Sequence, residues 1–389
     1  MLLYAQERAC YFVELSAVVS NDVKALATDW PVDLRYELHW LNGAVIEADT
    51  ATVVALRRHV GVDSVYWIGS TNAAPPLHLP HRSWDTAETP LPGRTEAGAL
   101  ARTHERLGLP ATTVPKSVPV RIAVLDGGFY GLNRHPYLAG LRSHLKGTFD
   151  FVDGDTVVTE LSAHGTQVVA LLAADAERVY KGGAPTMEYL LVRTEDVYRE
   201  EPIELYNMMA GLEYAYAHGA RIVHASLGYR LDSGGDGAYH TQQLHRALDR
   251  ASELGLFVIT SGGNQAGHSV SAPADHPAVL AVGALDARNR AAIFSSADDR
   301  KPELGAPGVR LPVLSVYGDQ LHAASGTSYS APLVTAMAAR LWSDYPECTA
   351  AELRQALLNS ADYTEPDRFG LPNYLRAEVL LRQRLGKSR

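Results

Sequence analysis

The sequence holds few of the features that stabilise a chain covalently or place it in a membrane. Its 389 residues include only two cysteines, Cys10 and Cys348, near opposite ends of the chain. Two cysteines cannot form a disulfide framework, nor a zinc site by themselves. No apolar run approaches the roughly 18 residues that cross a bilayer, because the longest, at 168–174, stops at Asp175. A disulfide scaffold and a membrane partner are therefore not expected.

Basic charge is scarce as well. Lys and Arg total 35 against 44 Asp and Glu, which gives a net charge of −9 with neutral histidines. A nucleic acid is not expected as the partner, because phosphate binding favours a basic surface. Glu7 and Arg8 interrupt the N-terminus before an apolar block can form, so no export signal is expected and the compartment is left open.

What the chain does have is a globular composition, with 46% hydrophobic and 20% charged residues. Its length favours two or three domains. Residues 11–68 show strand, helix, strand, strand, helix and strand patterns in that order, with a hairpin turn at Asn42–Gly43. This order predicts a small ferredoxin-like α+β domain. Prolines punctuate residues 71–119, which predicts a linker with one helix over 96–107.

From residue 120 onward, short apolar runs alternate with helical patterns. Such alternation predicts a mostly parallel sheet with helices on both faces, a three-layer α/β fold. Strands are expected at 120–125, 189–192, 221–224, 256–260 and 279–283. Helices are expected at 166–174, 203–218, 241–254, 330–344 and 350–360. The expected domains are 1–70, 71–119 and 120–389.

Four polar residues stand where predicted strands end or helices begin, which is where open α/β sheets place their sites. Asp126 follows a strand in IAVLDGGFYG, and His164 starts a helix in SAHGTQVV. Asn264 follows a pair of glycines in SGGN, and Ser328 starts a mostly apolar helix in GTSYSAP. Each also has a structural interpretation: a turn-capping Asp, a structural or exposed His, a left-handed turn Asn and an N-cap Ser.

Together the four residues supply the parts of acyl transfer. A Ser attacks, a His removes its proton, an Asp fixes the imidazole, and an Asn donates to the oxyanion. The chain order Asp, His, Ser is the order in subtilisin, whereas chymotrypsin and the α/β-hydrolases have different orders. Over residues 120–375 the chain resembles the subtilisin-like serine peptidases. This resemblance rests on VLDGG, HGTQVV, SGGN and GTSYSAP, with GGAP at 182–185 and ASLGY at 225–229 in support.

The resemblance implies a role for each of these residues. Asp126, His164 and Ser328 would form the triad, and Asn264 with the backbone N–H of Ser328 would form the oxyanion hole. The segment that pairs with an extended substrate would be Ser226, Leu227 and Gly228. Gly262 and Gly263 would line the primary pocket, with Gly262 standing where the family usually has Ala. The resemblance implies a peptide or protein substrate as the partner. It implies no metal ion or organic cofactor for the chemistry.

The 11–68 unit resembles the propeptide of this family, especially at 40–65, which implies a chaperone and an intramolecular inhibitor. The processing point is expected between Gly69 and Arg94. The expected function is therefore a serine endopeptidase made as a zymogen. Two alternatives share its residues: a peptide-tailoring ligase or macrocyclase, and a latent form held shut by its propeptide.

Two features of the sequence have residue types that bind metal ions. The acidic run DFVDGD at 150–155 suits either a calcium loop or a solvated turn, so structural calcium is left unassigned. His240 and His245 are five residues apart, not the four that place two ligands on one helix face, so a zinc site is not expected.

Overall fold

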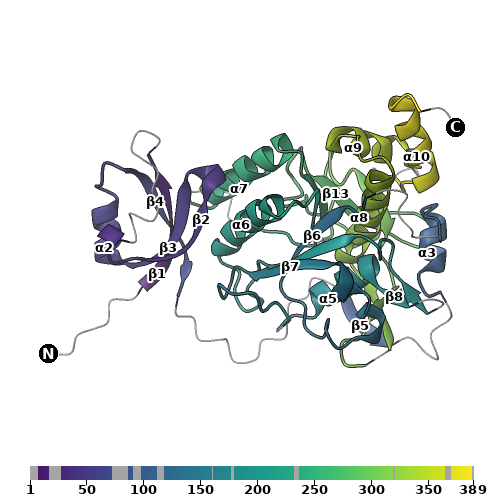
Figure 1. Ribbon diagram of the computed structural model, residues 1–389, viewed down its shortest axis with the longest axis horizontal. Coiled ribbons are helices and arrows are strands. Elements are labelled where there is room, and N and C mark those ends of the chain that lie inside the picture. Colours follow the sequence, from purple (N-terminus) through teal and green to yellow (C-terminus); the bar gives the residue numbers. More distant parts are fainter. Residues whose placement is uncertain are drawn as a thin grey trace.

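The chain folds into an N-terminal unit and a larger main unit, shown in the computed structural model of Figure 1. The structure describes residues 8–16, 28–71, 86–90 (backbone), 98–111, 118–159, 161–176, 179–231, 236–318, 320–363 and 369–387. We call residues 8–71 the N-terminal unit and residues 118–387 the main unit. Within the described residues, no helix has both the length and the apolar character that a membrane crossing needs.

In its described residues, the N-terminal unit is a four-stranded antiparallel sheet with the helix α2 against it. Its strand order is β2-β3-β1-β4. The elements are β1 (Arg8–Leu15), β2 (Asp33–Leu38), η1 (His39–Leu41), β3 (Gly43–Asp49), α2 (Thr50–Leu56) and β4 (Val62–Ser70). Asp49 caps α2 by accepting the backbone N–H of Thr52 at 2.8 Å. The other helix that the sequence predicts, near residues 22–28, falls almost entirely outside the described residues.

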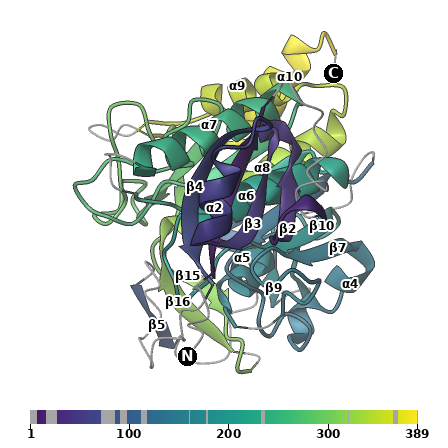
Figure 2. The same cartoon turned by 90° about the vertical axis from the view of Figure 1, so that its left-hand side faces the viewer.

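The described part of residues 71–119 adds elements to the main unit. The strand β5 (Thr86–Pro90) pairs antiparallel with β16 (Leu321–Ser325), which in turn pairs with β15 (Leu311–Leu314). The helix α3 (Ala101–Arg106) falls within the predicted range 96–107. Figure 2 shows β5 beside β16, well away from the last strand of the N-terminal unit. The stretch expected as a linker thus carries structure of its own.

The main unit is built on a seven-stranded sheet in which every pair of neighbours is parallel, in the order β14-β13-β12-β11-β6-β10-β7. The strands are β6 (Arg121–Asp126), β7 (Leu145–Asp150), β10 (Glu188–Arg193), β11 (Ile222–Ala225), β12 (Phe257–Ser261), β13 (Leu280–Leu285) and β14 (Leu304–Pro307). This arrangement confirms the predicted α/β fold. The five predicted strands are present, whereas the two edge strands, β7 and β14, lack a clean apolar run and were not predicted.

Helices cover both faces of this sheet. They are α4 (Leu141–His144), α5 (His164–Ala173), α6 (Ile203–Ala217), α7 (Asp236–Glu253), α8 (Thr327–Asp344), α9 (Ala350–Asn359) and α10 (Tyr374–Arg384), with short elements η2 (Pro136–Leu138), β8 (Asp175–Ala176) and β9 (Tyr180–Lys181). Alternate residues of β6 enter opposite cores: Ile122 packs with the α5 and α8 side, Ala123 with the α6 and α7 side.

The N-terminal sheet forms a further layer outside α6 and α7. Figure 2 shows it lying across these two helices. Phe12 and Val45 of the N-terminal sheet share one hydrophobic cluster with Tyr206 of α6 and Leu244 of α7. The ring centroids of Phe12 and Tyr206 are 4.9 Å apart, and Tyr66 stacks on Tyr239 at 3.6 Å. The two units therefore share a continuous apolar core.

Candidate active site

Asp126 and His164 meet at the carboxyl end of the central sheet. Asp126 is the last residue of β6 and His164 the first of α5. Nδ1 of His164 lies 2.9 Å from each carboxylate oxygen of Asp126, which is only 1% exposed. The backbone N–H of Gly127 also donates to this carboxylate at 2.8 Å. A carboxylate can only accept, so Nδ1 carries the imidazole proton in this arrangement.

The start of α5 requires the residues that follow His164. A Cβ at Gly165 would lie 2.5 Å from the carbonyl oxygen of Gly128, so only glycine allows this close approach. The backbone N–H of His164 donates to the hydroxyl of Ser162 at 3.2 Å, which satisfies one of the unpaired groups of the first turn. The HGT motif therefore fixes both the position of the ring and the start of its helix.

Ser328 is the second residue of α8 and is 7% exposed. This 18-residue helix has the positive end of its dipole at its N-terminus. The preceding turn is held by the backbone N–H of Gly326, which donates to the carbonyl of Gly308 at 2.9 Å. A negative charge that develops near Ser328 would be stabilised there.

Asn264 is held against the residue before Ser328. Its Oδ1 accepts the backbone N–H of Thr327 at 2.8 Å and the hydroxyl of Thr327 at 2.9 Å. The same hydroxyl accepts the backbone N–H of Gly263 at 3.1 Å. Because a backbone N–H can only donate, the atom facing it must be the amide oxygen. Nδ2, the donor group of Asn264, therefore faces away from Thr327.

The five residues implied as substrate-binding lie at the same edge of the sheet. Ser226, Leu227 and Gly228 follow β11, whereas Gly262 and Gly263 follow its neighbour β12. Gly263 has a φ of +98°, a backbone conformation that residues other than glycine rarely adopt. Gly262 has no such φ, although a Cβ there would make a tight contact, 3.3 Å from the carbonyl oxygen of Val282. Glycine is thus required by conformation at 263 and not at 262.

Sequence reasoning missed several residues that surround these groups. His224, fully buried within β11, contacts Ser226, and Thr327 orients Asn264. Tyr229 donates its hydroxyl to Glu195 at 2.5 Å. Burial raises the pKa of Glu195 above its ordinary value, and the negative charge of Asp126 adds to the rise. The signal available for His224 was a histidine inside an apolar strand, since a buried polar group needs a partner.

The acidic run at 150–155 closes around a cation supplied by the chain. Arg193 Nη1 lies 2.7 Å from Asp150 Oδ2 and 2.5 Å from Asp153 Oδ2. The other oxygen of Asp150 accepts the backbone N–H groups of Val152 and Asp153. Among the described residues there is no group of three or more His, Cys, Asp or Glu side chains arranged to hold a metal ion.

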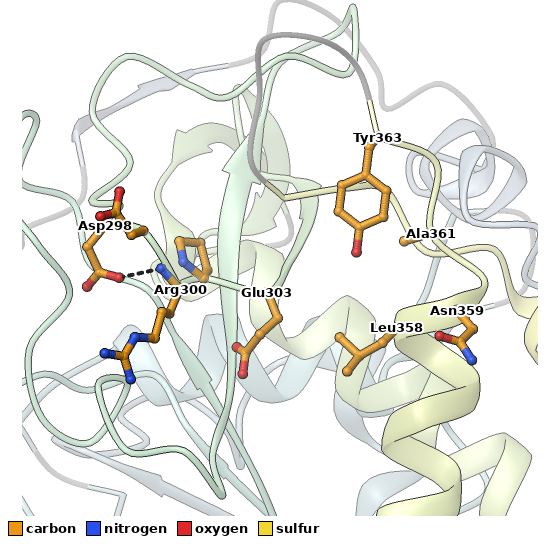
Figure 3. Close-up of a pocket in the computed structure, with 9 residues that line it drawn as sticks. Asp298, Arg300, Glu303, Leu358, Asn359, Ala361 and Tyr363 are labelled. Carbon is orange, nitrogen blue, oxygen red and sulfur yellow. Dashed lines mark hydrogen bonds between the residues drawn. The ribbon is translucent and has the colours of Figure 1, made fainter.

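A cavity of about 410 Å³ lies elsewhere, between the segment before β14 and the end of α9. Figure 3 shows Asp298 and Arg300 on one side, Tyr363 on the other and Glu303 between them. Asp298 accepts the backbone N–H of Arg300 at 2.9 Å, and Glu303 pairs with Lys301 and with Arg354. The cavity lining includes none of Asp126, His164, Asn264 and Ser328.

The main unit matches the model of the subtilase family over residues 119–378, so the chain belongs to the subtilase family. It is 30% identical over 253 residues to the thermostable alkaline protease of Halalkalibacterium halodurans, covering 64% of each chain. It is 34% identical over 243 residues to the thermophilic serine proteinase of Bacillus sp. (strain AK1), covering 62% of this chain and 56% of the relative. The matched part thus spans less than two thirds of these two relatives.

Two solved structures are similar in fold. One is the epidermin leader peptide processing serine protease EpiP from Staphylococcus aureus, with a TM-score of 0.72 and 16% identity over 98% of this chain and 100% of that one. The other is the prenylagaramide maturation protease PagA, with a TM-score of 0.58 and 25% identity over 75% of this chain and 100% of that one. The likeness to EpiP extends over nearly the whole chain and concerns the fold alone.

Proposed function

We propose that this chain is a serine endopeptidase in which Ser328 is the nucleophile, His164 the general base and Asp126 the residue that orients His164. The observation that carries the proposal is the pair of 2.9 Å contacts from Asp126 to Nδ1 of His164. With the proton on Nδ1, Nε2 is the nitrogen that can accept a proton from a serine hydroxyl.

The proposed reaction proceeds through an acyl-enzyme. Ser328 Oγ attacks the peptide carbonyl carbon while its proton passes to His164 Nε2. The resulting oxyanion receives hydrogen bonds from Nδ2 of Asn264 and from the backbone N–H of Ser328. His164 protonates the leaving amine, and a water molecule then hydrolyses the ester. These steps need no metal ion or organic cofactor, and we assign no structural calcium.

We propose that a peptide or protein substrate lies extended along Ser226, Leu227 and Gly228. Backbone hydrogen bonds to such a segment hold a peptide as an added strand, and pockets for alternate side chains supply specificity. Gly262 and Gly263 would line the primary pocket. Support comes from their position after two adjacent strands, at the edge where Asp126 also lies.

We further propose that the N-terminal unit is an intramolecular inhibitor and chaperone. Its contacts with α6 are specific: Glu213 accepts the backbone N–H groups of His39 at 3.1 Å and Trp40 at 2.8 Å, and Tyr36 donates to Asn207 at 2.6 Å. At the end of β4, Arg199 donates to the carbonyl of Ser70 at 2.9 Å. The unit thus ends against the segment that precedes α6.

Most of the expected processing range, Gly69 to Arg94, lies outside the described residues. Its described flanks belong to different parts of the fold, because Ser70 ends β4 of the N-terminal unit and β5 pairs with β16 of the main unit. We therefore propose cleavage between Thr71 and Thr86, with β5 retained by the mature enzyme.

Expression of the full chain and of Ser328→Ala tests this function. The wild-type chain should react with a serine-directed fluorophosphonate, cleave a denatured protein substrate and yield a species that starts between residues 72 and 86 by N-terminal sequencing. Ser328→Ala should remain full length and unlabelled. A wild-type chain that stays intact, unlabelled and inactive would overturn the proposal.

A second candidate function is peptide tailoring, in which the acyl-enzyme passes to an amine and gives ligation or cyclisation. The similar solved structures are a leader peptide processing serine protease and a prenylagaramide maturation protease, which favours a peptide precursor as the substrate of either reaction. Product masses separate the two functions, since hydrolysis adds one water to the products whereas cyclisation of a released peptide adds none. A latent form would be recognised by labelling that appears only after the N-terminal unit is removed.

A further inference from the structure

The carbonyl group of Ser328 occupies an unusual position in its helix. In an α-helix this carbonyl would accept the backbone N–H of the residue four positions later, which here is Pro332. Proline has no N–H, so the helix cannot supply that donor. The hydroxyl of Ser226 donates to the Ser328 carbonyl instead, at 3.0 Å. A side chain from β11's end thus completes the turn that carries Ser328.

A buried histidine contacts the Ser226 hydroxyl, and a buried threonine contacts that histidine. His224 Nε2 lies 2.9 Å from Ser226 Oγ, and His224 Nδ1 lies 2.9 Å from Thr335 Oγ1. His224 and Thr335 are fully buried, and Ser226 is 7% exposed. Thr335 stands two turns after Ser328 on α8, so the chain of contacts leaves this helix, crosses β11 and returns to it.

The direction of each hydrogen bond in this network follows from chemistry. A carbonyl can only accept, so Ser226 donates its proton to Ser328. Ser226 Oγ must then accept from His224, which places the proton on Nε2. Nδ1 is therefore the acceptor, and Thr335 donates to it. This direction requires a neutral imidazole, and burial lowers the pKa of His224 to about 3, with the charge of His164 adding to the fall.

We propose that His224 is a positioning residue: with Thr335 it orients the Ser226 hydroxyl, which ties the nucleophile's turn to the substrate-pairing segment. The proposal rests on the proposed peptidase function. Ser226 would bind substrate through its backbone and Ser328 through its side chain, so a link between them fixes the distance from Oγ to the scissile carbonyl. Loss of the link should lower kcat more than it raises KM, because misplacement of reacting groups acts on the chemical step.

The tautomer of His224 provides a test that does not depend on activity. Nitrogen NMR of the full Ser328→Ala chain, which cannot digest itself in the proposed mechanism, should give a neutral His224 with the proton on Nε2 from pH 5 to pH 9. His224→Gln assigns the signal by its disappearance. A proton on Nδ1, or titration of His224 within this range, would overturn the network.

Kinetics of a matched pair test the positioning role. Glutamine and methionine have similar size and shape, but only the Gln amide can donate to Ser226. We expect His224→Met to lose roughly 10- to 100-fold in kcat with little change in KM, and His224→Gln to retain most of the activity. Fluorophosphonate titration counts the competent sites, so the comparison is made per folded molecule.

Two more variants complete the design. Thr335→Val should lower kcat in the wild-type background and add little to His224→Met, because both act through one network. Ser343→Ala removes another buried hydroxyl of α8, which donates to the Val118 carbonyl, and should leave kcat unchanged. Equal activity of the Met and Gln variants, or a loss confined to KM, would overturn the proposal. A wild-type chain that neither labels nor hydrolyses would instead overturn the proposed function.

Discussion

The two faces of the central sheet are covered in different ways. On one face, every residue of α8 except Asp344 is buried, by the sheet, α5 and other parts of the main unit. On the other face, α6 and α7 pack on the sheet and are covered in turn by the N-terminal unit. The first covering belongs to the fold itself, whereas the second is a separate segment of the chain.

This difference separates two tasks. Ser328 lies in the first turn of α8, the helix that the main unit itself covers, and the network through His224 and Ser226 lies beside that helix. The N-terminal unit contacts the helices of the other face, for example through Phe12 against Tyr206 and through Trp40 to Glu213. The proposed cleavage would separate this unit from the rest of the chain. We therefore expect substitutions on the α8 side to lower kcat and to leave docking of the N-terminal unit unchanged. Substitutions on the α6 side should weaken docking and leave kcat unchanged.

The largest effect is expected from Ser328→Ala. In the proposed mechanism kcat should fall about 10⁶-fold, the loss known for the nucleophile of subtilisin, a member of this family. Docking of the N-terminal unit should be unaffected, so the full-length variant should unfold at the same or a higher temperature than an inhibited wild-type chain. Activity assays and thermal unfolding check the two halves; residual autoprocessing in the variant would contradict the assigned role.

The next effect concerns Asn264. Asn264→Asp keeps an oxygen that can accept from Thr327 but loses the Nδ2 donor, so kcat should fall by at least about 10²–10³-fold, the range measured for this donor in subtilisin. Thr327→Val is the control: it keeps Asn264 and the backbone N–H bond and loses only the hydroxyl. Steady-state kinetics should give it a much smaller loss. Equal losses would mean that Asn264 acts through structure and not as a donor.

On the α6 side, Phe12→Ala tests docking. Phe12 is fully buried against Tyr206. In the Ser328→Ala background its loss should destabilise the full chain by about 3–5 kcal/mol, the usual cost of truncating a buried aromatic ring. Urea unfolding monitors the change. In an active chain the processed enzyme should keep its wild-type kcat, and a changed kcat would break the separation between the two faces.

Some parts of the fold could be predicted from the sequence and others could not. The central strands could be predicted, because a strand that is buried on both faces is a run of apolar residues, as in β6 and β12. The edge strands β7 and β14 could not, because LKGTFD and LGAP carry Gly, Pro or polar residues that an edge position tolerates. The helix α10 was overlooked although Tyr374, Ala377 and Leu381 recur at helical spacing and are buried.

The candidate site divides in the same way. The motifs predicted Asp126, His164, Asn264 and Ser328, because each motif places its polar residue at an end of a strand or helix. The partners that orient them could not be predicted, since Thr335 lies 111 residues from His224 in sequence and only the fold brings them together. Likewise, the acidic run 150–155 gave no hint that Arg193, one strand away, would lie between its carboxylates.

The smallest expected effect is a pH dependence of docking through Glu213. Burial beneath the N-terminal unit raises the pKa of this carboxyl, although the N–H groups of Trp40 and His39 oppose the rise. A carboxyl whose pKa is higher in the docked state stabilises docking fully below its ordinary pKa and loses that contribution as pH rises through the docked value. Stability of the Ser328→Ala chain should therefore decline as pH rises through this window.

Glu213→Gln isolates that contribution. The Gln oxygen can still accept from the backbone of Trp40, but the side chain no longer titrates. Thermal unfolding of the two chains from pH 4 to pH 7 should give midpoints whose difference changes in favour of the Gln variant as pH rises. Because the effect arises on the α6 side, the pH profile of kcat for the processed enzyme should be the same in both. Parallel unfolding profiles would show that another group on the docking surface sets the pH dependence, and a shifted kcat profile would show that the two faces are coupled.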